Sequence, residues 1–126
     1  MPIFEIKALP QKKDIDPQVV MKKLCQEIAA LMKLSENQVW AIWEPILPGH
    51  YVEGGNSAEL QPESTHPPIV NLISFEGRPE QLMERVIVKT AEVLSRELKL
   101  ENGNVYVQFS ETRSGRTFVG GELKKR

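Results

Sequence analysis

The chain is poor in the residues that form cross-links or bind metals. Its 126 residues include one cysteine, Cys25, and two histidines, His50 and His66. One cysteine excludes an internal disulfide and any metal site built from several cysteines, and two histidines are too few for a convincing zinc site. We therefore expect no metal and no cofactor, so any chemistry must come from other residues.

Excess charge and long apolar runs are also missing. The 16 Lys and Arg against 17 Asp and Glu leave a net charge of -1, which removes the main electrostatic driver of binding to a phosphate backbone. The apolar runs fall far short of the ~20 residues of a membrane helix, and the N-terminus lacks the regions of a signal peptide. We expect a cytoplasmic protein that binds neither nucleic acid nor membrane.

An internal repeat organises the chain. A shift of 66 positions, the distance from Pro2 to Pro68, lays the first half on the second without a gap. Matched pairs include Pro2-Ile3 with Pro68-Ile69, Gly49 with Gly115, and Gly54-Gly55 with Gly120-Gly121. The sequence therefore predicts one domain over residues 1–126, made of repeat 1 (2–55), a polar, proline-rich linker (56–67) and repeat 2 (68–123).

Each half has the pattern strand, helix, strand. The segments rich enough in apolar and β-branched residues for strands are Ile3 to Leu9, Gln38 to Glu44, Ile69 to Phe75 and Asn104 to Ser110. Asp16 before Pro17 supplies the N-cap of the first helix. Pro79 starts the second helical segment, and Asn102-Gly103 ends it with a turn. Such crossovers between like strands are typical of βαβ units.

The predicted fold class is α+β, with two tandem βαβ units that form a four-stranded sheet and two helices on one of its faces. The strands themselves indicate what lies on the other face. In Val39-Trp40-Ala41-Ile42-Trp43 neither alternating set is polar, so apolar residues lie on both faces. Because two helices can cover only one face, we expect self-association to cover the second.

Three short motifs carry a resemblance to a known family. They are Met1-Pro2-Ile3 at the start, Phe75-Glu76-Gly77-Arg78 after the third strand, and Gly120-Gly121-Glu122-Leu123 near the end. At this spacing the chain resembles a fused, two-unit 4-oxalocrotonate tautomerase-like member of the tautomerase superfamily. The resemblance implies the tautomerase/MIF-like fold, a homotrimer, and a small-molecule carboxylate as substrate.

Pro2 is the candidate catalytic residue. If Met1 is removed, Pro2 becomes a secondary amine at the chain terminus, whose pKa near ~8 falls when the group is buried in an apolar pocket. A neutral amine can move a proton beside a carbonyl, which is tautomerisation. The resemblance implies this role of general acid or base for Pro2. Pro68, its repeat mate, is a tertiary amide and cannot fill the role.

Arg78 is the preferred anchor for a substrate carboxylate. It follows a strand and precedes Pro79 at a helix start, where its guanidinium can hold a carboxylate with two hydrogen bonds. The resemblance implies that Pro2 and Arg78 of one site come from opposite halves of the chain. Phe75 stands where dehalogenases and hydratases of the superfamily carry a second arginine, and we expect it to contact substrate.

Three further residues are candidates for the substrate pocket. Tyr106 stands where 4-oxalocrotonate tautomerases have a second arginine, and the segment Val105-Tyr106-Val107-Gln108 is similar to one in macrophage migration inhibitory factor. Tyr106 and Gln108 of a neighbouring chain could polarise a substrate oxygen. An interface role for Tyr106, satisfied by the backbone, is equally open. Phe118 could form the wall of the pocket or belong to the core.

The function predicted from the sequence is enol–keto proton transfer on a small 2-oxo or 2-hydroxy-enoic acid. A non-catalytic oligomeric binding or signalling protein of the same fold stays open as an alternative. A hydratase or dehalogenase is less favoured. Glu53 matches a water-activating glutamate of the superfamily's dehalogenases, but it lies in the half that lines the corresponding site around Pro68, where the nitrogen is not basic. Its equivalent near Pro2 is Val119, and we expect Glu53 to be a solvated or turn residue.

Overall fold

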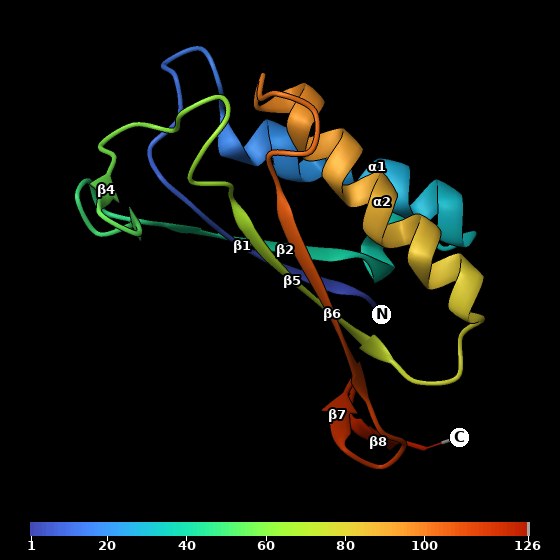
Figure 1. Cartoon of the computed structure of the whole chain (residues 1–126). Helices are drawn as coiled ribbons and strands as arrows, with labels where there is room; N and C mark the ends of the chain where they lie inside the picture. Colours follow the sequence, from blue (N-terminus) through green and yellow to red (C-terminus); the bar gives the residue numbers. More distant parts are fainter. Residues whose placement is uncertain (126) are drawn as a thin grey trace.

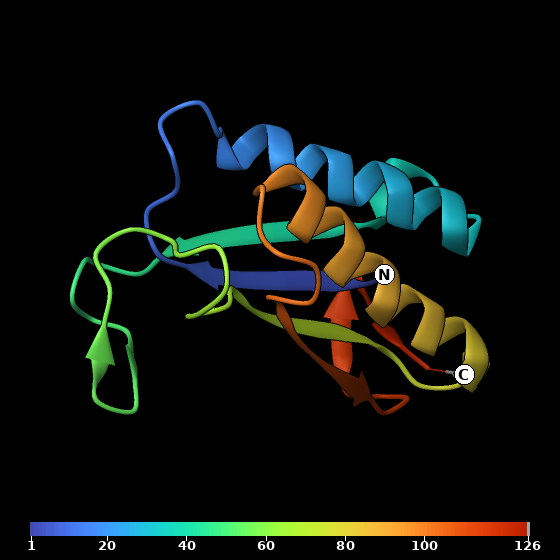
Figure 2. The ribbon, with the colours of Figure 1, turned by 45° about the horizontal axis from the view of Figure 1, so that its top comes forward.

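A computed structural model describes residues 1–125 and confirms the predicted α+β fold. The four-stranded sheet has the order β2-β1-β5-β6. Both helices lie on the same face of this sheet (Figures 1 and 2). The sheet strands are β1 (Ile3–Ala8), β2 (Trp40–Pro45), β5 (Ile69–Phe75) and β6 (Tyr106–Thr112), and the helices are α1 (Pro17–Met32) and α2 (Glu80–Glu97).

Two parallel strand pairs meet in the middle of the sheet. β1 pairs in parallel with β2, and β5 pairs in parallel with β6, as expected of βαβ units. β1 and β5 run antiparallel, with Ile3 opposite Ile73 and Lys7 opposite Ile69. The start of β1 therefore lies beside the end of β5, and this register decides which residues surround Pro2.

The helix boundaries follow local signals. The Asp16 carboxylate accepts a hydrogen bond from the backbone N–H of Gln18 at 3.0 Å, and Pro17 is the first residue of α1. The prediction that Asn102-Gly103 ends the second helical segment is wrong by several residues, because α2 already ends at Glu97. There Lys99 takes a left-handed conformation with φ 57°, which terminates the helix.

The same shift of 66 positions relates details of the two halves. Lys33 and Lys99 both have φ 57°. The N–H of Trp40 donates to the Pro2 carbonyl at 3.0 Å, and the N–H of Tyr106 donates to the Pro68 carbonyl at 2.9 Å. The two halves thus share one backbone design, while the predicted repeat limits, 2–55 and 68–123, stay predictions.

One short hairpin completes each half, and the sequence patterns did not predict the hairpin residues as strands. β3 (Val52–Glu53) pairs with β4 (Asn56–Ser57), and β7 (Thr117–Val119) pairs with β8 (Glu122–Lys124). Gly54 and Gly120 turn the two hairpins with φ 62° and 64°. The hairpins lie at opposite ends of the sheet (Figure 1). Each can therefore cover one end of the β1–β5 pair.

The core lies between the sheet and the helices. Phe4 and Leu72 from the central strands are fully buried against Leu24 of α1 and Leu94 of α2. Each such side chain contributes about 1.5–3 kcal/mol by leaving water. This layer therefore fixes the positions of β1 and β5 under the helices.

The opposite face of the sheet is uncovered in the single chain. Its large apolar side chains are partly exposed: Trp40 by 40%, Ile42 by 54%, Ile69 by 37% and Tyr106 by 53%. This agrees with the apolar alternation on both faces, and self-association through this face stays a prediction. No helix within residues 1–125 is long and apolar enough to cross a membrane.

The segment between the repeats is more ordered than the predicted linker. β4 forms part of it, and both Gln61 and His66 are buried, although the sequence indicated only a polar, proline-rich linker. Gln61 donates a backbone hydrogen bond to the carbonyl of Pro10 at 2.9 Å. Two polar side chains of this segment, Gln61 and His66, are therefore part of its packing, whereas others such as Glu59 are exposed.

An ion pair between the helices predicts a pH-dependent part of the stability. Arg96 of α2 hydrogen-bonds Glu27 of α1, which lowers the pKa of the Glu27 carboxyl below its ordinary 4.5. A carboxyl whose pKa is lower in the folded than in the unfolded protein stabilises the folded state at pH values above its unfolded pKa. This contribution is lost as the pH falls through the folded pKa. Glu27→Gln should lower the free energy of unfolding by roughly 0.2–1 kcal/mol at pH 7.

Urea unfolding at several pH values measures this effect. The difference between wild type and Glu27→Gln should shrink toward zero as the solution is acidified below the Glu27 pKa. Glu59→Gln, in an exposed loop, is the control and should match wild type at every pH. A Glu27→Gln difference that stays constant down to acidic pH would contradict the assignment.

Candidate functional site

Pro2 lies buried at the start of β1, beside a small apolar cavity. Extending the β1–β5 register by one residue puts Pro2 opposite Ser74. The cavity has a volume of about 60 Å³, roughly that of two water molecules at ~30 Å³ each. Its lining comes from both halves of the chain: Met1, Ile3, Trp40, Ile73, Ser74, Phe75, Thr112, Thr117 and Val119.

Among residues 1–125, no ionisable side chain lines the cavity beside Pro2. Its polar side chains are the hydroxyls of Ser74, Thr112 and Thr117 and the indole of Trp40. The hydroxyl of Ser74 is buried and has no hydrogen-bond partner within residues 1–125. An amine placed at Pro2 would be poorly solvated here, and desolvation disfavours its charged form.

Two of the predicted site residues, Phe75 and Arg78, are close in sequence and lie at this end of the sheet. Phe75 ends β5 and lines the Pro2 cavity, so the structure brings it to Pro2. Arg78 comes three residues later and lines a neighbouring hollow of about 410 Å³, together with Glu80, Glu84 and Glu111. Within one chain, Arg78 therefore lies at the same end of the sheet as Pro2 but not in the cavity lining.

The turn that carries Arg78 is fixed by Glu76. The N–H of Glu76 donates to the Thr112 carbonyl at 3.0 Å, and its carboxylate accepts from the N–H of Ser114 at 2.8 Å. Both bonds tie the turn after β5 to the end of β6. The backbone around Arg78 is therefore held in place.

Tyr106 and Gln108 lie at the far end of the sheet from Pro2 in the same chain. Tyr106 is opposite Ile69, and Ile69 is opposite Lys7, five residues along β1 from Pro2. At ~3.3 Å per residue this separation is about 17 Å. The Tyr106 hydroxyl donates to the Gln108 side chain at 3.4 Å, and both residues are exposed. One chain alone does not bring them to Pro2.

Phe118 is not part of the cavity lining in the single chain. It is 71% exposed on β7, whereas its neighbours Thr117 and Val119 line the cavity. Because side chains alternate along a strand, Phe118 points the other way. Strand β7 has only three residues, so the sequence showed no alternation that could fix which side chain faces inward.

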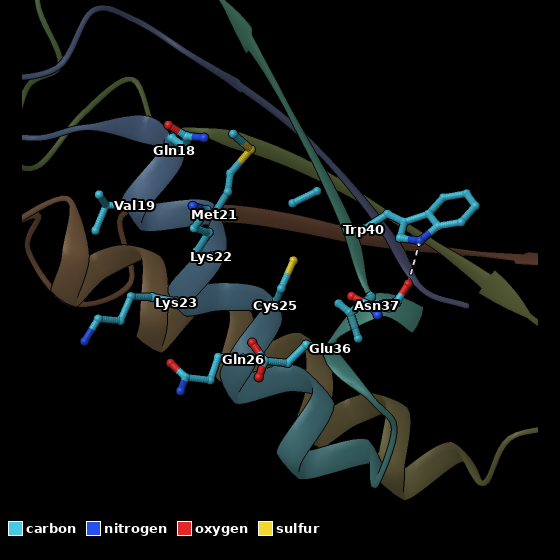
Figure 3. Close-up of a pocket in the computed structure, with 12 residues that line it drawn as sticks. Gln18, Val19, Met21, Lys22, Lys23, Cys25, Gln26, Glu36, Asn37 and Trp40 are labelled. Carbon is cyan, nitrogen blue, oxygen red and sulfur yellow. Dashed lines mark hydrogen bonds between the residues drawn. The ribbon is translucent and has the colours of Figure 1, made fainter.

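A second hollow, of about 680 Å³, lies between α1 and β2 and contains none of the predicted site residues. In Figure 3, Met21 and Cys25 extend from α1 toward β2, and the Trp40 indole donates to the Asn37 carbonyl at 3.0 Å. Burial raises the pKa of the Cys25 thiol, and the Glu36 carboxylate raises it further. A thiol that stays protonated is a weak nucleophile, so this groove offers little chemistry.

Comparisons with known proteins identify the fold. No family model matches the chain, and no curated protein matches it significantly by sequence. Among solved structures, Pt0534 inactivated by 2-oxo-3-pentynoate is similar with a TM-score of 0.82 and 13% identity, over 97% of this chain and 94% of that one. Native fused 4-OT is similar with a TM-score of 0.80 and 19% identity, over 96% and 94%.

A more distant similarity extends to a macrophage migration inhibitory factor-like protein from Entamoeba histolytica. Its TM-score is 0.68 at 14% identity, and the match covers 94% of each chain. At these identities the comparisons establish the fold alone. The chain therefore has the tautomerase/MIF fold, as the sequence predicted.

Proposed function

We propose that this chain is a fused tautomerase that moves a proton between the enol and keto forms of a small 2-oxo or 2-hydroxy-enoic acid. The observation that supports this most is the burial of Pro2 against a cavity built by both halves. The similarity to fused 4-OT, and to a protein that a 2-oxo acid inactivates, supports the substrate class.

In the proposed mechanism the Pro2 nitrogen is the general acid or base. The proposal requires a chain from which Met1 has been removed, which frees the nitrogen and takes the Met1 side chain out of the cavity lining. An α-amino group titrates near ~8, and the apolar surroundings lower that value, so the amine is neutral at pH 7. It can then take a proton from the substrate hydroxyl or carbon and return it elsewhere.

Arg78 is the proposed anchor for the substrate carboxylate. It lies at the same end of the sheet as Pro2, on a turn that Glu76 fixes. A charge-assisted pair of hydrogen bonds from the guanidinium would orient the acid with its reacting carbon toward the amine. Phe75, which lines the Pro2 cavity, would then contact the apolar part of the substrate.

We further propose a homotrimer in which Tyr106 and Gln108 reach the Pro2 site of a neighbouring chain. One fused 4-OT structure is a symmetric trimer and another an asymmetric one. Trimer contacts would cover the exposed apolar face and supply hydrogen bonds to a substrate oxygen as charge develops on it. Phe118, exposed on its hairpin, would meet a neighbour in the same assembly. A cytoplasmic location completes the proposal.

Water-adding chemistry is less supported, although one similar structure belongs to the cis-3-chloroacrylic acid dehalogenase family. Such chemistry needs a carboxylate beside the base to activate water. Val119 occupies that place in the Pro2 cavity. Glu53 instead accepts a hydrogen bond from the backbone N–H of His66 at 2.9 Å in the other half.

Replacing Pro2 tests the proton transfer. Intact mass should show loss of one methionine, and the protein should ketonise phenylpyruvate or 2-hydroxymuconate. Pro2→Ala should lower kcat, by up to the roughly 100-fold that a positioned base contributes, because the primary amine of alanine is held less rigidly than the ring nitrogen of proline. The pH–rate profile should show a base with a pKa below ~8. Unchanged activity in Pro2→Ala would contradict the role, and no activity toward either acid would favour a non-catalytic binding protein.

Replacing Arg78 tests the carboxylate anchor. Arg78→Ala should lower kcat/KM roughly 10- to 100-fold, since hydrogen bonds between charged groups are worth about 1.5–3 kcal/mol. The loss should be much smaller for a methyl ester of the same substrate, which offers no carboxylate. Arg85→Ala, at an exposed position on α2, is the control and should behave as wild type. Equal losses on acid and ester would show that Arg78 acts on folding and not on substrate.

Mixing two impaired variants tests the contribution of a neighbouring chain. Pro2→Ala replaces the secondary amine of proline with the primary amine of alanine and so impairs the base, and Tyr106→Phe lacks the phenol that would polarise the substrate oxygen. If one site combines Pro2 of one chain with Tyr106 of the next, trimers reassembled from both variants contain some complete sites and regain activity. If both residues act within one chain, the mixture stays as impaired as its parts.

A further inference from the structure

The shift that relates the two halves also relates the Pro2 site to a second place in the fold, around Pro68. The shift of 66 positions takes Met1 to Pro67, Thr117 to Tyr51 and Val119 to Glu53. Pro68 is buried and its carbonyl accepts the Tyr106 N–H, just as Pro2 accepts the N–H of Trp40. In a chain that begins at Pro2, nothing precedes the first proline. Before Pro68, however, the chain continues back through Pro67 and His66.

His66 is packed against Tyr51, the residue that corresponds to Thr117 of the Pro2 cavity lining. It is 3% exposed, and its ring meets the Tyr51 ring edge to face at 5.0 Å. Its Nε2 lies 2.9 Å from the Asn56 carbonyl, and its Nδ1 lies 3.0 Å from the Thr65 hydroxyl. A carbonyl only accepts, so Nε2 donates there, and both ring nitrogens have partners.

The hairpin residues in turn hold the backbone around His66. Glu53 accepts the His66 N–H at 2.9 Å, and the Tyr51 hydroxyl donates to the Pro67 carbonyl at 2.8 Å. Burial and the Glu53 carboxylate raise the pKa of the Tyr51 phenol, so it keeps the proton that it donates. The linker is therefore tied to the hairpin that corresponds to the cavity-forming hairpin of the other half.

The linker holds His66 from its other side as well. The side-chain amide of the buried Gln61 donates to the His66 carbonyl at 2.9 Å and to the Pro62 carbonyl at 3.0 Å. His66 itself has φ 47°, a left-handed conformation that is unfavourable for a residue with a side chain. Such a conformation persists where the surrounding contacts determine it.

We propose that the linker is a built-in plug, in which the His66 imidazole fills the half-site around Pro68 as an internal ligand. Each chain then presents one open half-site, at Pro2, although the fold contains two. The inference rests on the duplicated architecture and holds whether or not Pro2 is catalytic. When the His66 ring is absent, we expect the half-site around Pro68 to prefer a flat ring that can donate a hydrogen bond to the Asn56 carbonyl.

Removing the ring tests the plug. His66→Gly suits the backbone at φ 47° but leaves a cavity of imidazole size, so the Tm should fall by roughly 5–10 °C. Millimolar imidazole should then raise the Tm of His66→Gly along a saturable curve and restore at least half of the loss. The same imidazole should leave wild type unchanged. His50→Gly, which removes an exposed histidine, is the matched control and should show neither the loss nor the rescue.

Chemical modification of the wild-type chain covers the case in which His66→Gly fails to fold. Diethyl pyrocarbonate should modify His50 quickly and His66 only after urea unfolding, as mass spectrometry of peptides can show. The proposal is overturned if His66 reacts as fast as His50 in the native chain, or if imidazole stabilises folded His66→Gly no more than wild type. Neither measurement depends on tautomerase activity, so the two proposals fail separately.

Discussion

The antiparallel contact between β1 and β5 is the constraint on which the rest of the structure depends. Each βαβ unit alone is a parallel strand pair under one helix, with its proline at an unprotected strand start. The antiparallel register sets the start of β1 against the end of β5, so that Ser74 and Phe75 of one half stand beside Pro2 of the other. A site walled by both halves follows directly from this pairing.

The same pairing creates two equivalent ends, and covalent linkage makes them unequal. A peptide bond before Pro68 removes its basicity and brings the linker into its half-site, where His66 is enclosed. At Pro2 the corresponding space is a cavity. In the fused chain, the end of the sheet around Pro68 is thus a packed region and not an open pocket. This region contributes to stability because its buried groups have satisfied hydrogen bonds.

Features encoded by neighbouring residues were predictable from the sequence, and features that depend on distant contacts were not. The cap at Asp16 and the strand Ile69–Phe75 rest on local patterns and are confirmed. The hairpin strands have two or three residues, too few for an alternating pattern. The burial of His66 depends on Glu53, 13 positions away, and composition alone suggested a solvated linker. The resemblance suggested Pro2 and Phe75 as site residues, and the structure brings both to one cavity. The orientation of Phe118, by contrast, depends on a hairpin that no sequence pattern revealed.

The two outer strands of the sheet have an implication for growth of the assembly. β2 and β6 occupy equivalent edges, and their first residues, Trp40 and Tyr106, are related by the internal repeat but chemically different. A contact from the β2 edge of one molecule to the β6 edge of another is head-to-tail, and such contacts either close into a ring or extend into a filament. The indole of Trp40 and the phenol of Tyr106 differ in size and in hydrogen bonding, so the two edges are distinguishable. A closed ring of such subunits therefore has a direction. A two-fold dimer of identical, unfused units would present two identical edges, and a ring of such dimers would lack this direction.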